Sequence, residues 1–357
     1  MRTSGVCIAA VGTYLPDSVS VTEAVRQGRL DAAEAERSGM LGAAVAGDTP
    51  APEMAVRAVR TALGRWGGDT SELGLLLYAD VYRCGPDGWL PQSYVMREAV
   101  GGALLAVGVR QGCNGVFGAL ELAAAHLRGG GSEAALIVAA DNMGSPLVDR
   151  WQSSPGYFLA DGASALVLTR SAGFARLLSV NSRAVPELEA LHRGTQPLGP
   201  SGTARPVPLD LGARREEFYA GGDRPKGWKE RMMEAQRELL ATTLDEAGVG
   251  AEDMSRLVTP HASREMTDAW TSSLGLTLEQ SSWGFGRRVG HIMAGDQLAS
   301  VEHLLMAQEI GPGDRLLLVG SGPGLGLAAA VVEVTALPPW APGRHARIPD
   351  AAADGRH

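Results

Sequence analysis

Short continuous apolar runs alternate along the chain with longer segments of helical period. Runs of four to eight apolar residues are typical of strands buried on both faces of a sheet, and segments with apolar residues three and four apart are typical of covering helices. The alternation therefore predicts an α/β fold with a parallel or mixed sheet covered on both faces. Strands are expected at residues 4–11, 73–79, 103–110, 133–140 and 163–169, and helices at 21–37, 52–63, 91–100 and 113–127.

The same rhythm returns in the second half of the chain after a break. Residues 182–227 are rich in Pro, Gly and Arg and have no clear period, which favours a functional loop or a cap. A weak internal duplication is visible, in which residues 133–169 and 314–334 occupy corresponding places. Strands are expected at 174–180, 254–259, 314–319 and 325–334, and helices at 228–247, 264–274 and 294–310.

These patterns suggest two halves, residues 1–172 and 173–335, with the 182–227 insertion or cap in the second half and a frayed tail at 336–357. A chain of 357 residues with 45% hydrophobic and 20% charged residues can bury a large core. A net charge of −8 argues against a general nucleic-acid binder. No apolar run approaches the ~20 residues that span a bilayer, and the N-terminus has no signal-peptide pattern, so we expect a cytoplasmic protein.

Cysteine usage directs attention to one position. Cys7, Cys84 and Cys113 are far apart and odd in number, so they form neither a disulfide framework nor a zinc motif. Cys113 lies in Gly-Cys-Asn-Gly, between an apolar run and a helical segment, where a helix N-terminus would stabilise a thiolate. The spacing alone also suits a small buried hydrophobe, and both interpretations stay open on it.

Five motifs follow one another along the chain: Gln-Gly-Cys113-Asn-Gly, the run from Phe158 through Asp161-Gly162, Thr259-Pro-His261-Ala-Ser, Gly290-His291, and the glycine-rich Gly320 to Gly326. In this order they resemble a known family, the ketoacyl synthase III branch of the thiolase superfamily. The resemblance covers about residues 5–334 and implies a thiolase fold, a duplicated five-layer αβαβα sandwich with mixed sheets, in a homodimer that transfers acyl groups through a cysteine thioester. The middle segment and the tail lie outside the family core.

The resemblance also implies roles for single residues. Cys113 matches the acyl-accepting nucleophile, and its backbone N–H together with that of Gly322 matches the oxyanion hole. His261 matches the histidine that hydrogen-bonds the thioester oxygen. Asp161-Gly162 is expected to serve turn formation rather than catalysis.

The sequence departs from the condensing family members at His291, where they carry an asparagine. A histidine supplies a base in place of an amide. Thiolases have Gly-His here too, but they need a second cysteine in the last glycine-rich turn, and residues 320–326 contain none. Asp296 follows five residues later, where its carboxylate would orient the imidazole as in a Cys-His-Asp triad. Asp296 also fits a helix-start acid favoured by the helix dipole, and this alternative stays open.

A base beside an acyl-cysteine suits ester formation, in which an alcohol must lose a proton. The pattern resembles the O-acyl- and malonyltransferases of antibiotic biosynthesis, of the cervimycin malonyltransferase type. This implies transfer of an acyl group, malonyl by that resemblance, from a coenzyme A or acyl-carrier-protein thioester to a hydroxyl of a sugar or polyketide in secondary metabolism, with no cofactor and no metal. The alternatives are a condensing enzyme that selects a starter unit, and an inactive thiolase-fold partner of a synthase.

Further residues are candidates for binding the acyl donor. Arg150 and Trp151 are candidates for the entrance of the pantetheine arm. Arginines of the middle segment either face coenzyme A phosphates or an acidic carrier protein, or form a solvated surface. The arginines are Arg183, Arg193, Arg205, Arg214, Arg215 and Arg224, and the histidines that match no motif are His126, His192, His303 and His345.

Overall fold

The computed structural model describes residues 1–82, 84–199, 208–221 and 225–342, and a mixed sheet organises them. Within these residues, the N-terminal half arranges its strands in the order β5 (Leu105–Val109), β4 (Leu73–Ala79), β6 (Ala134–Asp141), β7 (Gly162–Thr169) and β1 (Cys7–Tyr14). The C-terminal half continues with β8 (Ala175–Ala184), β11 (Gly326–Val334), β10 (Arg315–Gly322) and β9 (Arg256–Val258).

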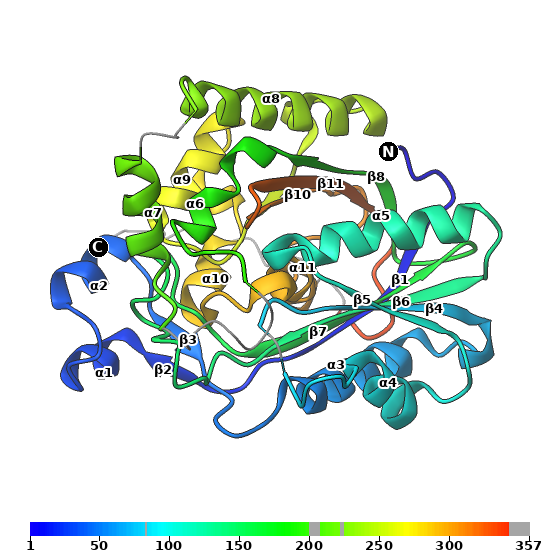
Figure 1. Cartoon of the computed structure of the whole chain (residues 1–357). Coiled ribbons are helices and arrows are strands. Elements are labelled where there is room, and N and C mark those ends of the chain that lie inside the picture. Colours follow the sequence, from blue (N-terminus) through cyan, green and yellow to red (C-terminus); the bar gives the residue numbers. More distant parts are fainter. Residues whose placement is uncertain (83, 200–207, 222–224, 343–357) are drawn as a thin grey trace, which may run out of the picture.

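The two arrays meet at a narrow junction. β1 and β8 pair antiparallel only through Cys7 with Arg176 and Ile8 with Ala175. Hydrogen bonding is therefore continuous across the strands, but Figure 1 shows the two arrays as separate layers above and below a pair of central helices.

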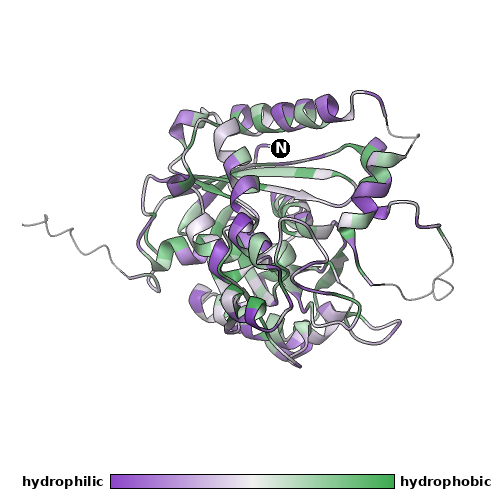
Figure 2. Cartoon of the chain, turned by 90° about the vertical axis from the view of Figure 1, so that its left-hand side faces the viewer, coloured by the Kyte–Doolittle hydropathy of each residue, from purple (hydrophilic) through white to green (hydrophobic). Residues whose placement is uncertain are grey.

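Helices form the other layers. α5 (Gly115–Arg128) and α11 (Asp296–Met306) lie between the arrays, α8 (Trp228–Ala247) covers the top, and α3 (Ala51–Trp66) and α4 (Pro91–Val95) cover the bottom (Figure 1). One apolar core surrounds the central helices between the two arrays, a second lies between the first array and α3, and a third lies between the second array and α8. Figure 2 shows that the polar and the hydrophobic residues of α8 lie on different faces of the helix. The five-layer αβαβα sandwich and the mixed sheet are as expected.

Pairing modes repeat between the halves. β6 and β7 are antiparallel neighbours, β4 runs parallel to β6, and β10, β11 and β9 repeat this arrangement. α5 and α11 enter the central layer at corresponding points, each after a single 3-10 turn, η3 (Gly112–Asn114) and η7 (Met293–Gly295). Both turns begin with a positive φ, 59° at Gly112 and 58° at Met293. The duplication visible in the sequence pattern therefore extends to the turns that begin the two buried helices.

Two expected elements differ from the structure. The single helix expected over 21–37 is two helices, α1 (Val21–Arg26) and α2 (Ala32–Ser38), because Gly28 takes φ 68° and Asp31 caps a new helix by accepting from the N–H groups of Ala33 and Glu34. The helix expected over 91–100 ends as α4 at Val95 and continues as a π-helical turn, Met96–Val100.

The segment 182–227 contains more structure than its composition suggests. β8 continues to Ala184, and η4 (Pro186–Leu188), α6 (Ala190–Arg193) and α7 (Leu211–Ala220) follow. Asp210 caps α7, and Phe218 packs into the core beneath α8. These helices are too short to show a period in the sequence.

The remaining elements are short. None of the helices in the described part of the chain is both long and apolar enough to cross a membrane. The elements not yet described are β2 (Ser18–Ser20), β3 (Gly42–Ala44), η1 (Thr70–Glu72), η5 (Ala251–Asp253), α9 (Arg264–Ser273), η6 (Leu278–Gln280) and α10 (Trp283–Val289).

Candidate active site

Cys113 lies where β5 turns into the buried helix α5. Gly112 makes the turn with φ 59°, and a Cβ there would lie 2.6 Å from Cδ of Pro323, so glycine is required both by conformation and by space. The side chain of Asn114 donates from Nδ2 to the carbonyl of Gly326 at 2.9 Å and ties this turn to the glycine-rich turn between β10 and β11. Cys113 is partly exposed, in the 3-10 turn directly before the N-terminus of the 14-residue helix α5.

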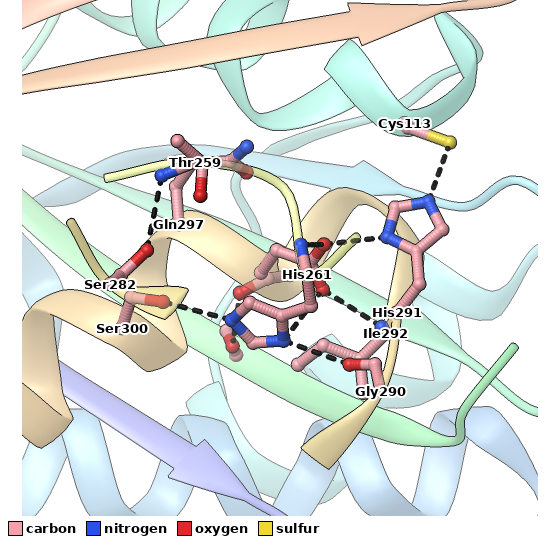
Figure 3. A network of polar contacts seen from close by, with 12 residues as sticks. Cys113, Thr259, His261, Ser282, Gly290, His291, Ile292, Gln297 and Ser300 are labelled. Atoms are coloured by element: carbon pink, nitrogen blue, oxygen red, sulfur yellow. Dashed lines mark hydrogen bonds and ion pairs between the residues drawn. The ribbon is translucent and has the colours of Figure 1, made fainter. Parts of the chain in front are cut away.

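Figure 3 shows a hydrogen-bonded chain from the thiol to a carboxylate. Nε2 of His291 lies 3.1 Å from Sγ of Cys113, and Nδ1–H of His291 donates to Oδ2 of Asp296 at 2.5 Å. Oδ1 of Asp296 accepts from the N–H of Ile292 at 2.8 Å. The structure thus brings together the three residues of the expected triad, and the carboxylate of Asp296 reaches the imidazole.

The backbone fixes the imidazole ring of His291. The backbone N–H of His291 donates to the carbonyl of Phe158, and the backbone carbonyl of His291 accepts from the N–H of Ala160, each at 2.8 Å. His291 is therefore paired with Leu159 as residues of neighbouring strands are. The ring of Tyr157 lies against the imidazole with 4.7 Å between centroids. His291 follows α10 and precedes η7, so it lies ahead of the helix start rather than in it.

His291 and Asp296 shift each other's pKa values in opposite directions. Burial disfavours the imidazolium of His291, but the negative charges of Asp296 and Cys113 outweigh it and hold the pKa of His291 well above its ordinary value. Burial likewise raises the pKa of Asp296, but the neighbouring His261 and His291 outweigh it, and the net shift is downward. The imidazolium–carboxylate state is therefore favoured at neutral pH.

His261 does not take the place that the resemblance implied. Its Nδ1–H donates to the carbonyl of Gly290 at 2.8 Å, and its Nε2 accepts from Oγ of Ser300 at 2.9 Å. Its backbone N–H donates to Oδ2 of Asp296 at 2.7 Å. Both ring nitrogens are engaged and the side chain is fully buried, so in this arrangement no ring N–H remains for a thioester oxygen. The expectation fails because packing turns the ring toward α11.

A buried neutral imidazole fits these partners. The carbonyl of Gly290 can only accept, so the proton is on Nδ1 and Nε2 is free to accept from Ser300. Burial lowers the pKa of His261, although Asp296 opposes the shift. Nδ1 also lies 3.2 Å from Oδ1 of Asp296, so one carboxylate serves two histidines.

Gly322 lies against the nucleophile's backbone. A Cβ on Gly322 would be 3.4 Å from the backbone nitrogen of Cys113, which puts the two backbones in close approach. This agrees in position with an oxyanion hole built from both N–H groups, and that role stays a proposal.

Arg150 is mostly covered and Trp151 is buried, which does not fit their expected place at a pantetheine entrance. The guanidinium of Arg150 pairs with the carboxylate of Asp161 at 3.1 Å and donates to the carbonyl of Leu159 at 2.7 Å. Trp151 is 3% exposed and packs edge-on against Phe158. Asp161 accepts from the backbone N–H groups of loops distant in sequence, and so it joins loops rather than forming a local turn.

The middle-segment arginines are divided. Arg183 pairs with Glu238 and Arg193 with Glu189, as expected of a solvated surface. Arg214 donates to the carbonyl of His192 at 3.1 Å, and Arg215 is partly buried on the same helix. Arg205, Arg224, His345 and most of the tail lie outside the described residues.

Histidines that match no motif pack within the fold. Burial lowers the pKa of His192 to about 4, and His303 stacks on Phe285 with 4.2 Å between ring centroids. His126 has its Nε2 buried without a hydrogen-bond partner. In the part of the chain that the structure describes, no group of three or more His, Cys, Asp or Glu side chains is arranged to hold a metal ion.

Little in the sequence indicated two further sets of residues, one in contact with His261 and one packed with Cys113. Ser300, one turn beyond Asp296 on α11, had no signal except its helical spacing from the carboxylate. An apolar set that includes Tyr157 and Met293 had none, because its members come from loops far apart in the sequence.

Known proteins resemble this chain along most of its length. A family model of 3-oxoacyl-[acyl-carrier-protein] synthase III matches residues 108–185, and a model of the C-terminal part of these synthases matches 244–334. The solved structure of ChlB3, an acyltransferase, is 48% identical, covers 94% of this chain and 99% of its own, and superposes with a TM-score of 0.90. The chain belongs to the ketoacyl synthase III-like branch of the thiolase superfamily.

Two further relatives are less similar to this chain. The β-ketoacyl-[acyl-carrier-protein] synthase III of Rhizorhabdus wittichii is 28% identical over 305 residues, which are 84% of this chain and 89% of that synthase. The 3-oxoacyl-[acyl-carrier-protein] synthase III of Aquifex aeolicus superposes with a TM-score of 0.73 at 22% identity over 92% of this chain and 99% of that one, which shows the shared fold.

Proposed function

We propose that this protein is an acyltransferase that works by a ping-pong mechanism through Cys113. The observation that carries the proposal is the unbroken hydrogen-bonded chain from Cys113 through His291 to Asp296. The donor is an acyl thioester of coenzyme A or of an acyl carrier protein, and the acceptor is a hydroxyl of a small molecule such as a sugar or a polyketide in secondary metabolism. ChlB3, the similar acyltransferase, supports the reaction class.

The first half-reaction loads the enzyme. The thiolate of Cys113, stabilised by the imidazolium of His291 and by the start of α5, attacks the thioester carbonyl. The N–H groups of Cys113 and Gly322 would stabilise the oxyanion of the tetrahedral intermediate. The intermediate collapses with loss of the donor sulfur, which takes the proton from Nε2 of His291. The products are an acyl-cysteine, a free donor thiol and a neutral imidazole.

The second half-reaction needs a base, and loading itself creates one. Acylation removes the negative charge of the Cys113 thiolate, one of the two charges that hold the pKa of His291 high. The imidazole, oriented by Asp296, then takes the proton of the acceptor hydroxyl as its oxygen attacks the acyl carbonyl. Cys113 leaves as a thiolate beside a regenerated imidazolium, and the ester is released.

Decarboxylative condensation fits this site less well. That reaction depends on donors at the thioester oxygen to stabilise an enolate. His291 is engaged with Cys113 and Asp296, and His261, the other candidate, has both ring nitrogens occupied by Gly290 and Ser300. The donor set that a condensing enzyme needs is therefore lacking among these residues.

The experiment separates loading from transfer. Intact-mass spectrometry with a panel of acyl thioesters should give a mass gain on the wild type that Cys113→Ala loses. In His291→Ala, Cys113 should still be acylated, but at a lower rate than in the wild type. Ester formation in single turnover from the acyl-enzyme should fall by about 1,000-fold. Turnover of His291→Ala near the wild-type rate would contradict the base assignment. Release of carbon dioxide coupled to a new C–C bond would instead favour condensation, and no loading by any donor would favour an inactive partner.

A further inference from the structure

Tyr157 contacts both the base and the glycine-rich turn of the second half. Its ring lies against the imidazole of His291, with 4.7 Å between the centroids and 38° between the planes. Its hydroxyl shares a hydrogen bond with the side chain of Ser321. Ser321 directly precedes Gly322 at the end of β10. One side chain therefore joins the ring of the base to the strand end that carries the expected oxyanion donor.

The backbone on both sides of Tyr157 is fixed. The carbonyl of Gly156 accepts from the N–H of Ser263 at 2.7 Å, and Gly156 takes φ 83°, a conformation that favours glycine. Two residues after Tyr157, Leu159 is paired with His291 as in neighbouring strands. The segment that carries the Tyr157 ring is therefore tied directly to the segment that carries the base.

The hydroxyl of Tyr157 stays protonated near neutral pH. Burial raises the pKa of Tyr157, the negative charges of Cys113 and Asp296 raise it further, and the hydrogen bond with Ser321 only partly opposes the shift. Tyr157 is therefore unsuited to act as a base itself. Its contribution lies in the contacts that its ring and its hydroxyl make.

The ring of Tyr157 lies against a cation in the resting enzyme, because the imidazolium state of His291 is favoured. An aromatic ring attracts a cation within about 6 Å of its centroid. This contact does not depend on the charge of the sulfur, so it persists when acylation removes the thiolate. The charged or titratable groups that act on His291 besides Tyr157 are Asp296, Cys113, His261 and Asp141.

The hydroxyl of Tyr157 acts at the strand end that carries Gly322. A Cβ on Gly322 would lie 3.4 Å from the backbone nitrogen of Cys113, so the two expected oxyanion donors belong to segments in close approach. Oxyanion donors act at about 3 Å from the oxygen, and a small displacement of one segment weakens them. The hydrogen bond between Tyr157 and Ser321 opposes such a displacement.

We propose that Tyr157 is a positioning residue that holds the base and the glycine-rich turn in one arrangement. Its ring stabilises the imidazolium of His291, and its hydroxyl holds Ser321 and with it the N–H of Gly322. The inference rests on the proposed acyl transfer through Cys113 and assigns Tyr157 a part in each half-reaction. The hydroxyl supports oxyanion formation, and the ring supports the base.

Tyr157→Phe tests the hydroxyl, because it keeps the ring. Acylation of Cys113 by p-nitrophenyl acetate forms an oxyanion, whereas alkylation of the same thiol by iodoacetamide forms none. We expect acylation, followed as the p-nitrophenolate burst with Cys113→Ala as the blank, to fall by about tenfold, while alkylation stays within about twofold of wild type. Tyr82→Phe is the matched control and should change neither rate, because Tyr82 also packs with Cys113 but its hydroxyl lies 3.4 Å from Oγ of Ser145.

Ser321→Ala removes the other partner of the same hydrogen bond. It should reproduce the loss of acylation seen in Tyr157→Phe. The double variant should lose no more than either single variant, because both substitutions remove one interaction. Losses that add in the double variant would show that the two hydroxyls act separately.

Tyr157→Leu tests the ring, because it removes the aromatic face and keeps an apolar side chain. Capping Cys113 with iodoacetamide leaves an uncharged sulfur, as in the acyl-enzyme. In the capped protein, NMR of labelled histidine, with His291→Ala to assign the signal, gives the pKa of His291. We expect this pKa to fall by about half a unit in Tyr157→Leu and to stay unchanged in Tyr157→Phe.

The outcomes separate this inference from the proposed function. Three results would overturn the inference alone: equal acylation of wild type and Tyr157→Phe, parallel losses of acylation and alkylation, or a His291 pKa that Tyr157→Leu leaves unchanged or raises. Additive losses in the double variant would do the same. A wild type without any acylation that depends on Cys113 would instead overturn the proposed function.

Discussion

Asp296 makes the most consequential contacts of any single residue in this protein. Its two oxygens accept from the ring of His291, from the backbone of Ile292 and from the backbone of His261. A carboxylate held by so many donors stays ionised and keeps its place, and that is what an orienting residue needs. At the residue scale, therefore, the chemistry depends on how Asp296 sets the tautomer and the pKa of His291.

Replacing Asp296 by Asn should separate these two effects. Since the charge of Asp296 raises the pKa of His291, its removal lowers that pKa, and the acid limb of the transfer step should move to lower pH. The rate on the plateau should fall by about 100-fold or more, because the amide no longer fixes the tautomer. The measurement is the pH profile of ester formation from pre-loaded enzyme. An unchanged profile would mean that Asp296 is only an acid favoured at the start of a helix and does not orient His291.

His261→Gln tests whether this histidine braces Asp296 or contacts the thioester. The backbone N–H to Asp296 survives the substitution, while the ring contacts to Gly290 and Ser300 are altered. As a positioning residue, it should leave acylation of Cys113 within about threefold of wild type, lower transfer by about tenfold, and shift the acid limb of its pH profile. Ser300→Ala, which removes only the partner of Nε2, should give a smaller change of the same kind. A loss confined to loading would contradict this role.

At the scale of elements, the start of α5 decides where the nucleophile stands. Gly112 has a positive φ and lies close to Pro323. The glycine-rich turn of the second half therefore contacts the residue that precedes the nucleophile of the first half. The equivalent start of α11 places Met293 and Asp296. Two corresponding helix starts thus supply opposite ends of one catalytic chain, which explains how a duplicated fold can hold an asymmetric site.

Gly112→Ala should be more costly than an alanine at an ordinary positive-φ glycine. Gly130, at the end of α5, has φ 76° and open space around its Cβ position, so Gly130→Ala should lower the free energy of unfolding by about 1 kcal/mol. Gly112→Ala adds the contact with Pro323 and should cost about 2 kcal/mol or more. Urea unfolding compares the two, and the rate of Cys113 acylation should fall only in Gly112→Ala. Equal stability of the two variants would show that Pro323 can move away from the new Cβ without lowering the free energy of unfolding.

At the scale of the whole molecule, the sheet ends in an exposed edge. β5 is an outer strand, Leu105 and Val107 on it are 59% and 37% exposed, and Leu122 on the adjacent α5 is 53% exposed. An edge strand with apolar side chains favours pairing with another strand. We expect two copies of the chain to pair through β5 and form a homodimer.

Val107→Lys should disrupt that dimer. Light scattering after size exclusion should give twice the 37.2 kDa chain mass for the wild type and a single chain mass for Val107→Lys. Met233→Lys is the control, because Met233 is 54% exposed on α8 in the outer layer, away from β5 (Figure 1). A monomeric wild type, or a Val107→Lys variant that stays dimeric, would rule out this edge.

The sequence by itself determined much of the fold because its signals are local. The apolar run 73–79 and the helix 228–247 were predicted residue by residue, since a strand buried on both faces and a helix stopped by Gly248 need no distant partner to be visible. The family resemblance carried by the order of the motifs also singled out Cys113 and His291, and the spacing of five residues suggested Asp296 as a partner of His291. The structure brings the three side chains together, and their catalytic roles stay predictions.

Only the tertiary structure decided where side chains point and what surrounds them. His261 turns toward Asp296 and Ser300, Arg150 pairs with Asp161, and Trp151 packs against Phe158. The apolar side chains that pack with Cys113 come from loops far apart in the sequence. Periodicity shows which face of an element is buried but not against what, because that depends on how distant layers pack. The sequence thus determined that a cysteine, a base and an acid are present, and packing decided that the three side chains form one hydrogen-bonded chain.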